Sequence, residues 1–186
     1  MDSFLNLTGI ICELVVFSIF IFCGLKVREF SIKEKTFSHL GSIKETAKIF
    51  NLGLFTYLIF RSIFIGKILS FYRLWNNLPI ISTYAICLLS VLLAIFFSVK
   101  KYELIHFILT RLAVLLSILF FLIFSIDFIN RNTFLSIFNL VIFLWVFIVG
   151  IIFVLRRKTN GIYQIFFFTP ILIWDWVMTL KLFNII

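Results

Sequence analysis

Charged residues, histidine and cysteine are all scarce in this chain of 186 residues, and each scarcity argues against a class of protein. Charged residues make up 13% of the chain against 63% hydrophobic residues, a balance that excludes a water-soluble fold. His39 and His106 are the only histidines and lie far apart, so a zinc hydrolase that needs several histidines is disfavoured. The three cysteines lie inside apolar runs, which argues against a disulfide framework and against a cysteine metal site.

Signature motifs of the common enzyme classes are also missing. The sequence has no glycine-rich phosphate loop, no serine nucleophile elbow and no paired aspartate motif. We therefore lean towards a protein that is not an enzyme, and we expect no metal and no cofactor. The net charge of +9 does not indicate nucleic acid, because the basic residues are spread through short loops between apolar runs. Contact with membrane lipids is the simpler interpretation.

Six long apolar stretches fill almost the whole chain. A bilayer span needs about 20 apolar residues, and continuous runs without period-2 alternation select helices over a barrel. We therefore predict an all-α polytopic membrane protein, a bundle of six transmembrane helices in a single domain over 1–186, with a basic segment at 26–48. The expected spans are 5–25, 49–71, 79–99, 105–126, 133–155 and 162–183.

Local signals predict where several of these helices begin. Asn77, Leu78 and Pro79 suit a loop followed by a helix start, and Asn160 with Gly161 breaks the chain before the sixth span. Either Asn132 or Thr133 can cap the fifth span. The segment Ser42–Glu45 has a capping-box pattern, which predicts a helical turn there before the second span enters lipid.

Lysine and arginine are distributed unequally between the two ends of the predicted bundle. Eleven lie in the loops after the first, third and fifth spans and three at the opposite end, so the positive-inside rule places both termini outside a cell membrane. Trp75, Trp174 and Trp176 lie near predicted span ends, where they suit interfacial anchoring.

Glu13, Arg61 and Asp175 lie well inside the first, second and sixth spans. Counted from the outer end of each span at about 1.5 Å per residue, their depths agree within roughly one helical turn. A lone charge at mid-bilayer costs about 3 kcal/mol or more, so we expect the three to pair. The three charges fit an ion pair that only fixes helix packing, a ligand pocket in the outer half, or a proton or ion path, and the pocket is the functional prediction among these.

Three further residues fall on helical stripes of small and polar side chains and are candidate ligand-binding residues. Tyr57 lies four residues before Arg61, Gln164 shares a stripe with Asp175, and Asn139 lies on a stripe of the fifth span. Such stripes usually mark helix contacts in lipid. His106, at the start of the fourth span, is a secondary candidate.

These features leave the function open between four classes. The first is a membrane protein that binds a lipid headgroup or a small polar ligand in the pocket. The second is a small, proton-coupled transporter, and the third is a scaffold subunit that binds another membrane protein. The fourth is a lipid-modifying enzyme that uses His106. No internal repeat supports an inverted-repeat transporter.

Three short motifs carry a family resemblance: 38–42 (SHLGS) followed by 49–54 (IFNLGL), 104–106 (LIH) and 161–165 (GIYQI). They resemble motifs of domain-of-unknown-function family 998, six-span membrane proteins distantly similar to the DRAM/Frag/Sfk group. The first is similar to the family's pattern before and at its second span, and the second to its histidine at the fourth span. The third resembles its Gly-x-x-Glu-Arg, with Gln164 and Ile165 in place of Glu-Arg. The resemblance implies six helices and, by analogy, an association with membrane lipids.

Overall fold

The computed structural model describes residues 2–156 and 159–185, and within these ranges the chain is all-helical, without a strand. Six helices are long and apolar enough to cross a bilayer, so the protein is a polytopic membrane protein of six transmembrane helices. A short 3-10 helix, η1, lies between the first two. The elements are α1 (Asp2–Lys26), η1 (Phe37–Ser42), α2 (Ala47–Phe71), α3 (Leu78–Phe96), α4 (Glu103–Phe128), α5 (Thr133–Leu155) and α6 (Gly161–Leu182).

Three helices begin at the asparagines that the sequence indicates. The side chain of Asn77 accepts a hydrogen bond from the amide of Ile80, and Asn132 and Asn160 do the same for the amides three residues on. The capping box expected at 42–45 does not form. Ser42 instead donates its hydroxyl to the carbonyl of His39 in η1, and α2 begins only at Ala47.

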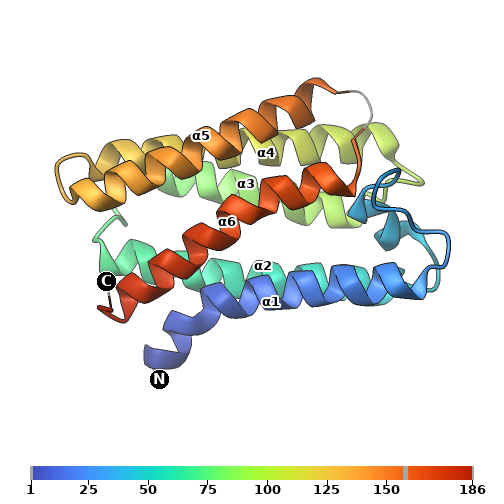
Figure 1. Cartoon of the computed structure of the whole chain (residues 1–186), viewed down its shortest axis with the longest axis horizontal. Coiled ribbons are helices and arrows are strands. Elements are labelled where there is room, and N and C mark those ends of the chain that lie inside the picture. Colours follow the sequence, from blue (N-terminus) through green and yellow to red (C-terminus); the bar gives the residue numbers. More distant parts are fainter. Residues whose placement is uncertain (1, 157–158, 186) are drawn as a thin grey trace.

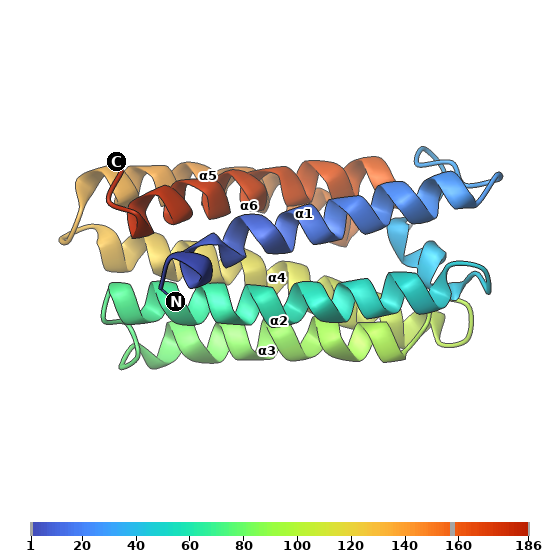
Figure 2. The same cartoon turned by 90° about the horizontal axis from the view of Figure 1, so that it is seen from below.

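Both termini lie at one end of the bundle (Figures 1 and 2), as an even number of helices requires. The opposite end holds the segment 27–46 with η1 and the α3–α4 and α5–α6 connections, and we call it the basic end. Helix α1 packs on α2, and α4 packs on both α3 and α5. Helix α6 crosses between these two groups and contacts α1 and α5 (Figure 1). This central position lets α6 carry side chains to both halves of the core.

Large apolar side chains cover the outside of the bundle, as lipid contact requires, and aromatic rings fill its centre. Trp174 is 0% exposed and has the rings of Phe121 and Phe124 edge-on at 5.5 and 5.6 Å between centroids. It is therefore a core residue, and its prediction as an interfacial anchor was wrong. Its neighbour Trp176 is half exposed on the lipid side of α6.

Candidate functional site

Three ionisable side chains from three helices meet in the middle of the bundle. Arg61 of α2 contacts the Oδ2 atom of Asp175 of α6 directly, and its Nη1 atom lies 3.7 Å from Oε1 of Glu13 of α1. Their exposed fractions are 8%, 0% and 1% respectively. Each helix presents its charged residue inward because the opposite face carries apolar side chains that lie in lipid. We call this group the charge cluster.

The charge cluster holds two acids and one base, and its hydrogen bonding is incomplete. Asp175 receives the Arg61 guanidinium on one oxygen, while its Oδ1 has no hydrogen-bond partner. Neither oxygen of Glu13 has one. Among the described residues, Cys12, Glu13 and Asp175 bring potential metal-ligand atoms within 4.8 Å of one another. The guanidinium of Arg61 already lies against this group, and its charge would oppose a divalent cation there.

Asn139, one of the predicted ligand-binding residues, lies behind the charge cluster and takes part in packing. Its Oδ1 accepts a hydrogen bond of 2.7 Å from Nε1 of Trp174, which joins α5 to α6. The Arg61 guanidinium carbon in turn lies 5.6 Å from the Trp174 ring centre, within the range of a cation–π contact. Asn139 is fully buried and does not line the neighbouring cavity.

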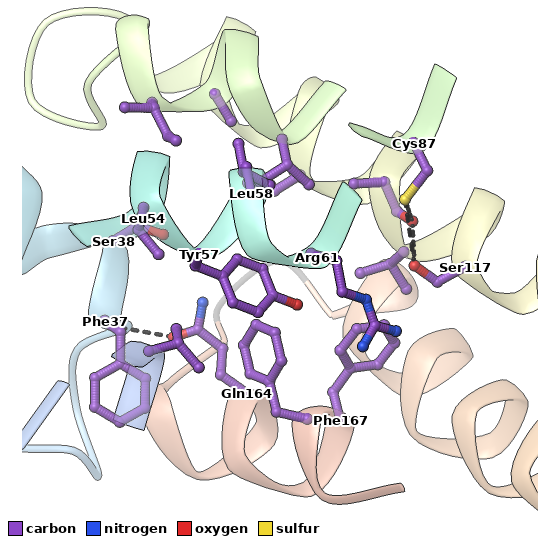
Figure 3. A pocket seen from close by; sticks show the side chains of 18 of the residues that line it. Phe37, Ser38, Leu54, Tyr57, Leu58, Arg61, Cys87, Ser117, Gln164 and Phe167 are labelled. Atoms are coloured by element: carbon purple, nitrogen blue, oxygen red, sulfur yellow. Dashed lines mark hydrogen bonds between the residues drawn. The ribbon is translucent and has the colours of Figure 1, made fainter. Parts of the chain in front are cut away.

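A cavity of about 210 Å³ extends from Arg61 towards the basic end of the bundle. Tyr57, Arg61, Gln164 and Phe167 project towards it from α2 and α6 (Figure 3). Most of the wall is apolar, with polar groups at the basic end (Ser38, His106, Gln164) and others further along it (Tyr57, Arg61, Cys87, Ser117). The lining residues of α2 run from Phe50 to Arg61, which corresponds to about 16 Å of helix at ~1.5 Å per residue. The space is therefore long and narrow.

The position of this cavity differs from the expected outer-half pocket. Only Arg61 of the charge cluster lines it, and most of its wall comes from the halves of the helices nearest the basic end, although Tyr84 of α3 and Ser117, Phe120 and Phe121 of α4 extend it past the middle of the bundle. Glu13 and Asp175 lie behind Arg61. Counting residues from the span ends predicted that the three charges lie at the same depth in the membrane. Such a count does not show whether the cavity lies above or below that depth.

His106 of α4 lines the same cavity near the basic end. Its Nδ1 lies 3.0 Å from the carbonyl oxygen of Ala94 and 2.8 Å from that of Phe97. Because carbonyl oxygens can only accept, Nδ1 carries a proton, and in the neutral tautomer with this proton Nε2 is an acceptor. Nε2 is buried without a hydrogen-bond partner. His106 thus offers a free acceptor beside a lipid-like space.

Other polar lining residues were not predicted as site residues. Cys87 of α3 has its Sγ 3.5 Å from Oγ of Ser117 of α4 (Figure 3), and Tyr84 contributes a buried hydroxyl without a partner. Ser117 lies eleven residues after His106, three helical turns along the same face. A periodic search from His106 finds this stripe on α4, but the α3 residues lack such a signal because α3 is apolar on most of its surface.

The helix η1 closes the cavity at the basic end. Phe37, Ser38 and Gly41 belong to its wall, and the amide of Phe37 donates a 2.6 Å hydrogen bond to Oε1 of Gln164. Gln164 was predicted as a ligand-binding residue, and it both lines the cavity and holds η1. The segment before η1 is fastened to α6 as well, since the amide of Gly161 donates to the carbonyl of Lys35 at 2.9 Å.

Comparison of the chain with models of protein families, with curated proteins and with solved structures finds no match. The resemblance to domain-of-unknown-function family 998 therefore stays a prediction. The charge cluster and the cavity are therefore the two features that bear on function.

Proposed function

We propose that this protein binds one single-chain amphiphile, a molecule with one slender apolar chain and a hydroxyl-bearing head, in the cavity between α2, α3, α4 and α6. The observation that carries the proposal is the shape of the cavity together with its lining. A volume of about 210 Å³ lies below the roughly 300–1,000 Å³ of pockets for drug-sized ligands, and a length of about 16 Å suits an extended chain.

The polar residues at the two ends of the cavity favour a ligand whose head group is uncharged. Near the basic end, the Nε2 atom of His106 is a free acceptor, and Ser38 and Gln164 add polar groups that recognise a hydroxyl. At the deep end, Arg61 already contacts Asp175, so it offers little attraction to a further anion. Leu54, Leu58 and similar residues between these ends suit an apolar chain.

We further propose that the protein lies in a cell membrane with its basic end towards the cytoplasm and both termini outside. The eleven basic residues of that side against three on the other support this orientation. Two of the eleven, Arg157 and Lys158, lie outside the described residues. A tag at either terminus should be accessible on intact cells, and an epitope in 27–46 should require permeabilisation.

Photolabelling tests the ligand proposal. A fatty alcohol that carries a diazirine should label the α2 and α3 walls, around Leu58 and Val91. Ala94→Phe should abolish this labelling because Ala94 is buried on the cavity wall, so a phenyl ring there fills the space. Ala85→Phe places the same ring on the exposed face of the same helix and should label like wild type. Equal labelling of the two variants, or none in wild type, would refute the proposal.

Native mass spectrometry then identifies the natural occupant. We expect the wild-type protein and Ala85→Phe to retain a single-chain species after mild extraction, and Ala94→Phe to lose it. Retention of a two-chain phospholipid by all three proteins would point to the outer surface of the bundle as the binding place.

A further inference from the structure

We propose that the charge cluster is a proton-binding site, and that at neutral pH Glu13 carries the bound proton as a neutral carboxylic acid. The proposal does not depend on the ligand in the cavity. It concerns three helices that meet behind the cavity wall, and the experiment below detects the protonated carboxyl group directly.

The charge cluster has more acidic than basic groups. Arg61 contributes one positive charge and touches Asp175, so these two compensate each other. An ionised Glu13 would add a second negative charge a few ångströms away. With 1% of its surface exposed, water cannot solvate that charge, and an ionised carboxylate in an apolar interior is strongly disfavoured without hydrogen-bond donors. Protonation of one of the two carboxyl groups removes the excess negative charge.

Hydrogen bonding assigns the proton to Glu13 rather than Asp175. Asp175 accepts from the guanidinium directly, whereas both Glu13 oxygens lack a hydrogen-bond partner and the nearest Arg61 nitrogen is 3.7 Å away. The unpartnered Oδ1 of Asp175 is a ready acceptor, because the ligand atoms of Cys12, Glu13 and Asp175 all lie within 4.8 Å of one another. A small rotation of the Glu13 side chain lets its O–H donate to Asp175.

The other neighbours favour a proton over a metal cation. Cys12 of α1, Tyr57 of α2 and Tyr84 of α3 are the remaining titratable groups around the cluster, and thiols and phenols of ordinary pKa are neutral at neutral pH. Arg61 is the one nearby cation among the described residues, and Trp174 covers its guanidinium. A sodium or zinc ion would have to sit beside that fixed positive charge, while a proton on Glu13 leaves the cluster at net zero.

Infrared spectroscopy of the purified wild-type protein tests the proposal. A carboxyl that holds its proton has a carbonyl stretch that a carboxylate lacks, and we expect such a band at neutral pH to come from Glu13. Isotope-labelled glutamate should shift this band, and labelled aspartate should leave it in place. Glu13→Gln should remove the band. Asp127→Asn changes a carboxyl that pairs with Arg131 near the end of the bundle that holds the termini, and this variant should keep the band.

Each possible result separates this proposal from its rivals. Absence of the band in wild type overturns it, as does a band that shifts only with labelled aspartate. A band that disappears in Ala94→Phe and survives in Glu13→Gln would belong to a bound fatty acid in the cavity. If the band is absent and sodium or zinc raises the melting temperature, a metal cation balances the cluster instead.

Discussion

Trp174 donates its indole N–H to Oδ1 of Asn139 at 2.7 Å, and this hydrogen bond links α6 to α5 directly behind the charge cluster. The same indole lies against the Arg61 guanidinium. Trp174 thus holds the helix that carries Asp175 in place while it covers the cation that Asp175 pairs with. Asn139 acts in this arrangement by fixing the tryptophan.

Trp174→Phe should therefore destabilise the protein strongly. It removes the only hydrogen bond to Oδ1 of buried Asn139 that the described residues show, and it leaves a space in the core. Together these effects should cost about 2–4 kcal/mol of unfolding free energy, measured by denaturation in detergent. Trp176→Phe makes the same exchange two residues on, at the half-exposed position, and should stay within about 0.5 kcal/mol of wild type. Equal losses in both variants would contradict this role for Trp174.

Arg61→Ala should be the most damaging change at the charge cluster. It leaves Asp175 ionised and buried without its partner, which typically costs about 3–5 kcal/mol. The double variant with Asp175→Asn removes both charges and should recover most of the loss in melting temperature. If Arg61→Ala melts like wild type, the pairing does not contribute to stability.

The sequence predicted the membrane architecture and the charged residues of the site for clear physical reasons. Lipid demands long apolar helices, so six runs identify six spans. A charge inside such a run has to find a partner, and therefore Glu13, Arg61 and Asp175 could be expected to meet. The start of the fifth helix could be predicted at Asn132 or Thr133 because a cap depends only on residues within one turn.

Other features depend on how the helices rotate and cross, which a single sequence does not encode locally. Trp174 near a predicted span end looked like an interfacial anchor, yet the rotation of α6 turns it into the core and turns Trp176 outward. The polar stripe with Asn139 correctly indicated an inward face but could not distinguish packing from ligand contact. Helix η1 is held at the basic end of the cavity by a hydrogen bond between Phe37 and Gln164, which are 127 positions apart in the sequence.

The hydrogen bond between the Phe37 amide and Gln164 should hold η1 against α6. Gln164→Leu keeps the volume of the side chain but removes the acceptor of the Phe37 amide, so η1 should open more often. Amide hydrogen exchange across 37–42 should accelerate roughly 2- to 10-fold, the range expected for one net hydrogen bond. Thr169→Val on the same helix loses only a hydroxyl that bonds to Ile165 within α6, and it should leave exchange in 37–42 unchanged.

Acid should loosen η1 through His39, which lies in it outside the membrane-spanning helices. Burial lowers the pKa of His39 below its ordinary value, and the nearby cation of Lys35 acts in the same direction, as does His106, while the Thr36 hydrogen bond and Glu103 oppose it. The docked segment thus binds a proton less readily than the free segment. Its docking free energy is fully present above the ordinary histidine pKa and is lost as pH falls through the lowered one.

Protection factors for 37–42, corrected for intrinsic exchange, should therefore fall as pH is lowered from neutral through about 6 and below. His39→Gln cannot take up the proton, so its protection should stay flat over the same range. If His39→Gln shows the same acid slope as wild type, another group controls the opening of η1, and His106 on the cavity wall becomes the first to test.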